Sequence, residues 1–251
     1  MQESIRMLRK LPSFAMRRVM GTITHVSTRE PVAALTFDDG PAPEFTPRLL
    51  DILERHNARA TFFVIGRLAA RHRKLVERMS LAGHSIGNHS WDHPSFPLIE
   101  GHKRREQMRA WEEATGPYGQ RLFRPPYGHQ SLASRLDAFW LGYKVVGWSI
   151  ASEDWLGFDA DCLAERVSSK IRPGSVVLFH DALYMVLEDR FADRQPTVEA
   201  VNILLKRLGG RFRFVTVPEL LKRGCPQQRN WYYREDENWL SKLKPVLAYE
   251  A

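Results

Sequence analysis

The chain of 251 residues has a formal net charge of +8, and its hydrophobic and charged fractions, 43% and 26%, are those of an ordinary globular protein. This length suits one large α/β domain with a buried core. Two distant cysteines exclude a disulfide framework, and basic residues scattered without a familiar nucleic-acid motif argue against a nucleic-acid partner.

Residues 1–30 are interpreted as a basic N-terminal extension. Ile5, Leu8 and Leu11 recur at near-helical spacing among arginines, which predicts either an amphipathic helix in peripheral contact with a membrane through residues 1–20 or a short helix packed on the domain. The extension lacks the apolar run of a signal peptide, and no stretch of the chain approaches the ~20 apolar residues of a membrane span. We therefore expect a cytoplasmic or inner-membrane-facing location.

From residue 31 onward, strand-like and helix-like segments alternate. The apolar run at residues 31–37 is typical of a strand buried on both faces, and residues 46–57 carry leucines at helical spacing. Further strands are predicted at residues 60–66, 84–88, 122–124, 144–148, 175–180 and 211–217, and a helix over residues 67–83. About seven such repeats predict a parallel sheet, either an incomplete barrel or a doubly wound one. This domain, residues 31–224, is followed by an aromatic-rich tail, residues 225–251.

Chemistry-bearing side chains follow several of the predicted strands, at the point where each strand gives way to a loop. Carboxyl ends of parallel strands open onto one face of the fold, which is where sites form. We therefore expect polar groups from five strand ends to converge in space. They are Asp38 and Asp39, His89 and His93, Arg124 and Tyr127, Asp154 and Trp155, and His180 and Asp181.

His89 and His93 are four residues apart and can share one face of a helical turn. Two imidazoles with one carboxylate, from Asp38 or Asp39, leave a position open for water, as in catalytic zinc sites. A metal held there lowers the pKa of its bound water and polarises a carbonyl oxygen. The alternative for the histidine pair alone is the start of a surface helix.

Five motifs, in the order TFDDG, HSWDH, RPPYG, DW and LFHD, carry a specific resemblance. They resemble the motifs of the polysaccharide deacetylase family, which is carbohydrate esterase family four and shares its homology domain with nodulation-type chitooligosaccharide deacetylases. The resemblance extends from residue 32 to residue 222. It implies an α/β fold, a distorted, incomplete (β/α)7 barrel of parallel strands with outer helices. It also implies metal-dependent hydrolysis of an N-acetyl, less often an O-acetyl, group on an acetylated oligosaccharide or polysaccharide.

Carried over residue by residue, the resemblance makes Asp38 the general base and makes Asp39, His89 and His93 the ligands of a divalent metal. Zinc is the expected metal, with cobalt or another transition metal as the alternative, and its bound water is the nucleophile. Arg124 is expected to pair with Asp38. Neighbouring residues of a strand point to opposite faces, so both aspartates reach one site only if the chain turns there. The glycine and proline that follow permit this turn.

The remaining motifs imply the other catalytic groups. The backbone N–H of Tyr127 is expected to face the developing oxyanion, as in other acyl-transfer sites. His180 is expected to be the general acid that protonates the leaving amine, held protonated and oriented by Asp154. Trp155 and Leu178 are expected to bind substrate by lining the small pocket for the acetyl methyl group.

One position departs from the family pattern, because Ala151 stands where the fourth motif often has a first aspartate. This departure affects the hydrogen bonding expected around that loop. Two other functions fit the same scaffold, a catalytically silent carbohydrate-binding relative and a deacylase of a non-sugar amide. A missing ligand or base would mark the silent relative, and none is missing. The motifs leave the acetylated substrate open among chitooligosaccharide, peptidoglycan and lipid-linked precursors.

Overall fold

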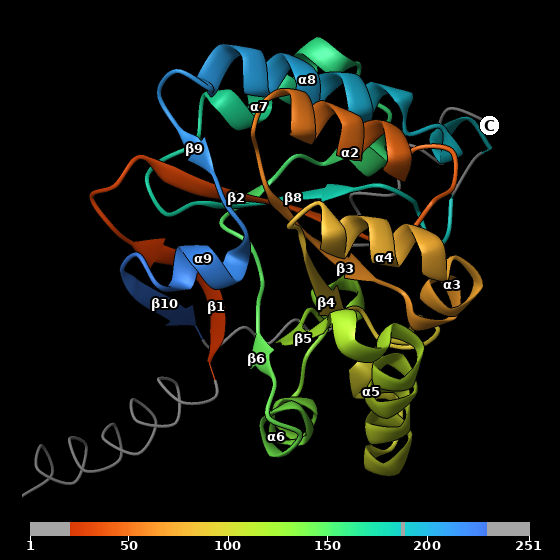
Figure 1. The fold of residues 1–251 in the computed structure, drawn as a ribbon. Helices are drawn as coiled ribbons and strands as arrows, with labels where there is room; N and C mark the ends of the chain where they lie inside the picture. Colours follow the sequence, from red (N-terminus) through yellow and green to blue (C-terminus); the bar gives the residue numbers. More distant parts are fainter. Residues whose placement is uncertain (1–20, 187–188, 230–251) are drawn as a thin grey trace, which may run out of the picture.

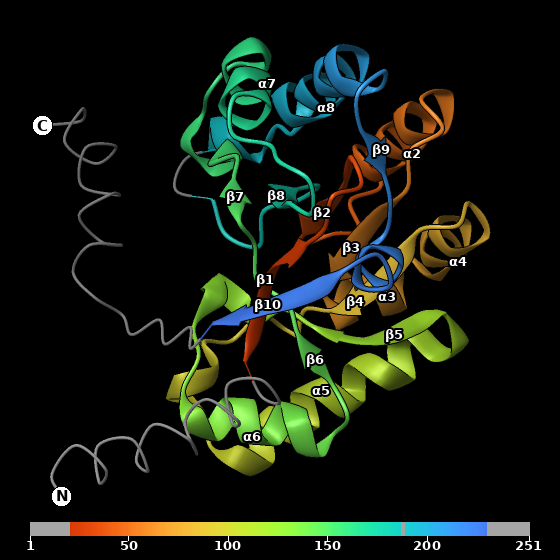
Figure 2. The same cartoon turned by 90° about the vertical axis from the view of Figure 1, so that its left-hand side faces the viewer.

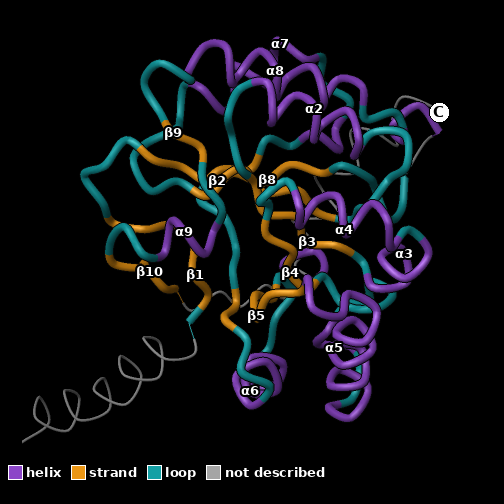
Figure 3. Tube along the Cα trace, viewed as in Figure 1, coloured by secondary structure: helices purple, strands orange, loops and turns teal. Residues whose placement is uncertain are grey.

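The computed structural model describes residues 21–186 and 189–229 (Figure 1). The predicted membrane-contact segment, residues 1–20, and the tail beyond residue 229 lie outside the described residues. Parallel strands curl into a half-barrel with helices around its outer side (Figures 1 and 3). The predicted incomplete barrel of parallel strands with outer helices is confirmed.

The main sheet has the strand order β6-β5-β4-β3-β2-β8-β7, and β9 pairs with β2 beyond this path. All of the pairs between these strands are parallel. The strands are β2 (Val32–Asp38), β3 (Ala60–Val64), β4 (Ser85–Asn88), β5 (Gly119–Phe123), β6 (Lys144–Val145), β7 (Ile150–Ala151), β8 (Val176–His180) and β9 (Arg213–Phe214).

The helices lie between successive strands, as the alternating pattern predicts. They are α2 (Thr46–Arg55), α3 (Gly66–Arg71), α4 (Arg73–Leu81), α5 (Gly101–Thr115), α6 (Leu132–Trp140), α7 (Ala160–Ser168), α8 (Gln195–Leu208) and α9 (Val217–Leu221). The helix predicted over residues 67–83 is two helices, because the backbone at His72 leaves helical geometry with φ −121° and ψ 44°. The short 3₁₀ turn η1 (Phe96–Leu98) follows the HSWDH motif, η3 (Pro126–Gly128) lies within RPPYG, and η4 (Asp154–Leu156) begins with DW.

The centre of the sheet is its most buried part. Every residue of β2 is buried, and Phe37 stacks on Phe62 and Phe179 with ring centroids 5.1 Å and 5.9 Å apart. Leu49 of α2 and Leu204 of α8 belong to the same core. Each such side chain contributes about 1.5–3 kcal/mol when fully buried. The packing therefore fixes β2, and with it the aspartate at its carboxyl end.

A second, two-stranded sheet joins the two ends of the described chain. Here β1 (Thr22–Ser27) pairs antiparallel with β10 (Cys225–Arg229), and both strands lie side by side in Figure 2. These strands lie outside the boundaries predicted at residues 30 and 224. The division into extension, catalytic domain and tail stays a prediction.

Candidate active site

The predicted catalytic side chains gather at the carboxyl ends of the parallel strands. Asp38 ends β2 and His180 ends β8, and the register of this parallel pair places the two residues opposite each other. His89 directly follows β4 and Arg124 directly follows β5. Asp154 follows β7 rather than the strand predicted over residues 144–148, because the observed strand there, β6, ends at residue 145.

Both adjacent aspartates reach the site because the turn begins at Asp39 itself. Its backbone is left-handed, with φ 71°, which reverses the strand alternation that would direct Asp39 away from Asp38. The N–H of Tyr184 donates to Asp39 Oδ2 over 2.9 Å and leaves Oδ1 for the site. A Cβ atom at Gly40 would overlap the buried carboxylate of Asp181, so only glycine fits there. Asp181 lies behind this turn and receives a hydrogen bond from Thr46.

Asp39, His89 and His93 form a compact, buried group whose ligand atoms all lie within 4.8 Å of one another. Asp39 Oδ1 is 3.3 Å from His89 Nε2 and 3.2 Å from His93 Nε2. Ligands at 2.0–2.1 Å around a tetrahedral zinc are about 3.3 Å apart. Both distances from Asp39 Oδ1 therefore fit a metal of this size.

The protonation of the two histidines also fits a metal. His89 Nδ1 lies 2.7 Å from the carbonyl oxygen of Arg124. A carbonyl only accepts, so Nδ1 carries a proton, and Nε2 is the ring nitrogen that can bind a metal. Burial lowers the pKa of His93, although the nearby Asp39 carboxylate raises it, so the neutral form is favoured. Asp39 Oδ1 is buried without a hydrogen-bond donor among the described residues. Acceptor atoms that face one another away from water repel, and a cation bound between them removes this repulsion.

The carboxylate of Asp39 is ionised. Burial opposes its charge, but the two imidazoles against it, those of His93 and His89, hold the pKa of Asp39 well below its usual value. One carboxylate beside two imidazoles is the donor set of catalytic zinc sites.

Arg124 lies beneath Asp38 and is fully buried. Its Nη1 donates to Asp38 Oδ1 and to Thr36 Oγ1, each over 2.7 Å, and its Nη2 donates to the carbonyl of Gly147 over 2.8 Å. The guanidinium also lies 4.1 Å from the ring centroid of Phe63. Burial lowers the pKa of Arg124, but an arginine stays charged in proteins. The guanidinium of Arg124 is therefore fixed by burial and hydrogen bonds, and it holds the Asp38 carboxylate in one orientation.

His180 and Asp154 form a second charged pair. His180 Nδ1 donates to Asp154 Oδ1 over 2.8 Å, and the His180 backbone N–H donates to Oδ2 over 2.8 Å. Burial lowers the pKa of His180, but attraction to Asp154, assisted by Asp39 and Asp38, outweighs it and raises that pKa to about 9. Burial also opposes the charge on Asp154, and attraction to His180 lowers the pKa of this carboxyl nonetheless. The imidazole is thus cationic at neutral pH.

The start of α8 and its N-cap residue support this pair. Thr197 Oγ1 donates to Asp154 Oδ2 over 3.1 Å, and Arg194 Nη1 donates to the Asp154 carbonyl over 2.9 Å. Both residues are buried. Asp154 therefore has partners that hold its carboxylate and its backbone in place.

The three other predicted site residues lie around these pairs. The Tyr127 ring packs against His93 with centroids 4.5 Å apart, and the Trp155 ring meets His180 edge-on at 5.3 Å. Leu178 is buried in β8 and pairs in register with Ala151, the position that departs from the family pattern.

Left-handed backbone recurs in these loops. Besides Asp39, four non-glycine residues around the site have φ between 58° and 65°, namely Ser90, His93, Tyr127 and Glu153. The sharp turns direct neighbouring side chains into one small volume, which an extended chain could not do.

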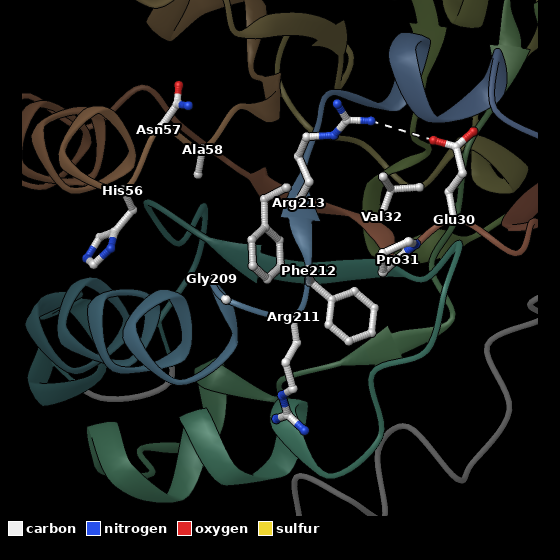
Figure 4. Close-up of a pocket in the computed structure, with 12 residues that line it drawn as sticks. Glu30, Pro31, Val32, His56, Asn57, Ala58, Gly209, Arg211, Phe212 and Arg213 are labelled. Atoms are coloured by element: carbon white, nitrogen blue, oxygen red, sulfur yellow. Dashed lines mark ion pairs between the residues drawn. The ribbon is translucent and has the colours of Figure 1, made fainter.

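The hollow in Figure 4 lies elsewhere on the molecule. It is lined by Glu30, Val32, Arg211 and Arg213, among others. Val32 begins β2, whereas Asp38 ends it. Seven residues of strand separate the two positions by about 20 Å. This hollow is therefore not part of the catalytic face.

Four residues of the site were missed by the sequence reasoning: Thr36, Tyr184, Arg194 and Thr197. Thr36 lies inside an apolar strand, and Tyr184 contributes a backbone N–H that any residue has. Arg194 and Thr197 belong to no motif and lie about forty residues from Asp154 along the chain. The sequence offered one signal for Arg194, since this arginine directly precedes an apolar helical pattern.

Comparison with known proteins places the chain among described families. A model of the polysaccharide deacetylase family matches residues 25–146. A peptidoglycan-N-acetylglucosamine deacetylase of Bacillus cereus is 37% identical over 194 residues, which cover 75% of this chain and 68% of that protein. A chitooligosaccharide deacetylase of a Bradyrhizobium species is 36% identical over 222 residues, covering 84% and 98%.

Solved structures share the fold. The Bc1960 peptidoglycan N-acetylglucosamine deacetylase superposes with a TM-score of 0.76 and 31% identity, covering 86% of this chain and 98% of that one. A family 4 acetyl xylan esterase from Clostridium thermocellum, in complex with a cobalt ion, superposes with a TM-score of 0.68 and 31% identity, covering 76% and 90%.

The half-barrel, the charged pairs at its strand ends and these relatives define a hydrolase that acts on carbon–nitrogen bonds other than peptide bonds. The chain belongs to the polysaccharide deacetylase family and is a carbohydrate deacetylase.

Proposed function

We propose that this enzyme removes N-acetyl groups, and O-acetyl groups as a secondary activity, from an acetylated oligosaccharide or polysaccharide in a metal-dependent reaction. The observation that carries the proposal is the register of β2 and β8, which sets Asp38 opposite His180. One is an anion held by Arg124 and the other a cation held by Asp154. A base and an acid therefore face the same substrate position from two sides.

Asp39, His89 and His93 would hold the metal, zinc or else cobalt. When bound, such an ion polarises the acetyl carbonyl and lowers the pKa of a water molecule. The cobalt ion in the acetyl xylan esterase supports a transition metal at this group.

The reaction then uses the chain's own groups in turn. Asp38 accepts the proton of the attacking water, while Arg124 keeps its carboxylate directed at the site. His180 carries a proton on Nδ1, shared with Asp154, and a second on Nε2 because the imidazole is cationic. It donates the Nε2 proton to the leaving nitrogen. The N–H of Tyr127 would stabilise the oxyanion, and Trp155 and Leu178 would enclose the acetyl methyl group.

An assay of acetate release tests this function. The substrates are N-acetylated chitooligosaccharides, peptidoglycan fragments and an O-acetylated xylan, each with and without chelator. We expect acetate from at least one N-acetylated glycan, loss of activity in chelator, and recovery with zinc or cobalt. Full activity of the chelated protein would contradict metal dependence. Release of no acetate, with zinc bound, would favour the catalytically silent alternative. The cytoplasmic or inner-membrane-facing location stays a prediction, and no described helix is long and apolar enough to cross a membrane.

A further inference from the structure

Helix α6 has its polar side inside and its apolar side outside. The residues of α6 that the structure exposes are all apolar, namely Leu132, Ala133, Leu136, Phe139 and Trp140. The four large ones form what we call the α6 outer face, and they are 46%, 36%, 42% and 77% exposed. A helix on a soluble surface normally has the opposite pattern, with its apolar stripe toward the core.

The orientation of α6 is fixed by its polar side. Asp137 is buried and accepts hydrogen bonds from Arg104 Nε and Arg105 Nη1 of α5, each over 2.6 Å. Ser134 and Ser131 form a reciprocal cap at the start of the helix. Rotating α6 to bury its leucines would break this buried ion pair, and separating such a pair strongly destabilises a fold. The apolar outer face is therefore held toward the outside.

The outer face is continuous rather than scattered. Its four residues recur at the spacing of one helix side, and the rings of Phe139 and Trp140 are neighbours with centroids 6.2 Å apart. The turn η1, which packs against α6, also exposes a large apolar side chain, Leu98, by 68%. Single exposed leucines need no explanation, but a contiguous apolar patch marks a surface that binds something.

Charge beside this face indicates which kind of partner it meets. Phe139, Gly21 and Lys144 line one small hollow at the edge of α6. Lys144 is exposed and has no ion pair within residues 21–186 and 189–229. The chain enters the described structure at Gly21, and the twenty residues before it carry five basic side chains against a single acidic one. Lys144 therefore sets a cation beside an apolar, aromatic face, and the sequence that leads to Gly21 is basic.

We propose that the α6 outer face docks on an anionic lipid bilayer. Leucine, phenylalanine and tryptophan on one helix side enter the boundary between headgroups and acyl chains, and flanking cations bind the anionic headgroups. A second copy of the chain fits less well. A nine-residue helix is about 14 Å long and about 10 Å wide, whereas a stable dimer buries about 800 Å² on each partner. The inference does not depend on the proposed deacetylation.

Vesicle flotation of the full chain tests the proposal. The probes are vesicles of phosphatidylcholine alone and vesicles with half phosphatidylglycerol. We expect the protein to float with the anionic vesicles, and less of it at high salt, because salt screens the cationic contribution. Trp140→Ser should weaken this binding by about 10-fold or more, the factor expected for losing one buried apolar side chain. Lys144→Glu should also weaken it.

Leu81→Ser on α4 is the matched control, since Leu81 is 80% exposed but far from α6 in sequence. It should float like the unchanged protein. Unfolding curves of all variants check that exposed substitutions leave the fold intact. Absence of flotation, or equal flotation of Trp140→Ser, would overturn the proposal. A dimer in solution that Trp140→Ser dissociates would overturn it in favour of a second copy.

Discussion

Replacing Asp154 by asparagine should make activity fall steeply between pH 6 and pH 8, a range in which His180 of the unchanged enzyme stays almost fully cationic. The amide keeps the shape of the side chain but removes the charge that lies 2.8 Å from His180 Nδ1. In the native site, attraction to Asp154 is the largest influence raising the pKa of His180, and burial is the influence that opposes it. Without that carboxylate, the pKa should fall from about 9 toward 6.5 or lower.

The size of the defect follows from the protonated fraction of the imidazole. With a pKa of about 9, nearly all of it is cationic at pH 7 and about 90% at pH 8. With a pKa of about 6.5, these fractions fall to about 25% and about 3%. A reaction that needs the cation should therefore lose about 1.3-fold at pH 6, about 4-fold at pH 7 and about 30-fold at pH 8.

The assay is kcat/KM for acetate release between pH 6 and pH 9, with the zinc content measured at each pH. Asp193→Asn is the control, because this exposed carboxylate lies near Arg194 and does not contact His180. Its profile should match that of the unchanged enzyme. A loss of equal size at every pH would refute the reasoning, since Asp154 would then orient His180 without setting its charge.

Three further outcomes are expected. Asp39→Asn should bind zinc weakly and regain turnover in excess zinc. Asp38→Asn should keep its zinc and lose ~10²–10⁴-fold in turnover. If Asp38→Asn lost its zinc and Asp39→Asn kept it, Asp38 would be the metal ligand and Asp39 the base. Thr197→Val removes one hydrogen bond to Asp154, about 1 kcal/mol, so turnover should fall about 5-fold at unchanged zinc content, and an unchanged rate would show that this bond is dispensable. The metal-free protein should be stabilised by His180 below pH 6.5 and lose about 3 kcal/mol as pH rises through about 9, because the folded-state pKa is the higher one. Chemical unfolding of Asp154→Asn should show no such loss.

Much of this architecture was predictable because local pattern and tertiary burial agree. The run Val32–Phe37 is apolar at every position, and the observed strand is buried at every position. Asp38 is the first charged residue after this run and marks the end of the strand. Because sites form at the carboxyl ends of parallel strands, the position of the site could be predicted from it. Motif order then placed His89, Arg124 and His180 at other strand ends.

Other features depend on contacts that no local pattern records. Strand β7 has two residues, too few for a periodicity. The helix predicted over residues 67–83 breaks at His72 although its apolar spacing continues. Arg194 and Thr197 matter because α8 packs behind η4, and that packing is decided by the whole fold. A turn was expected at the two aspartates, but that Asp39 itself is the left-handed residue is something the local sequence does not specify.

Five residues of the site have left-handed backbone, and this affects how the sequence changes in a lineage that loses its activity. They are Asp39, Ser90, His93, Tyr127 and Glu153. Each non-glycine residue in this conformation costs roughly 1–2 kcal/mol, and the total is comparable to the ~5–15 kcal/mol by which a whole domain is stable. In a lineage that no longer needs catalysis, glycine at any of the five positions relieves this backbone cost. Loss of activity in this fold should therefore leave a readable trace, in which glycines accumulate at these turns while the buried strands stay unchanged.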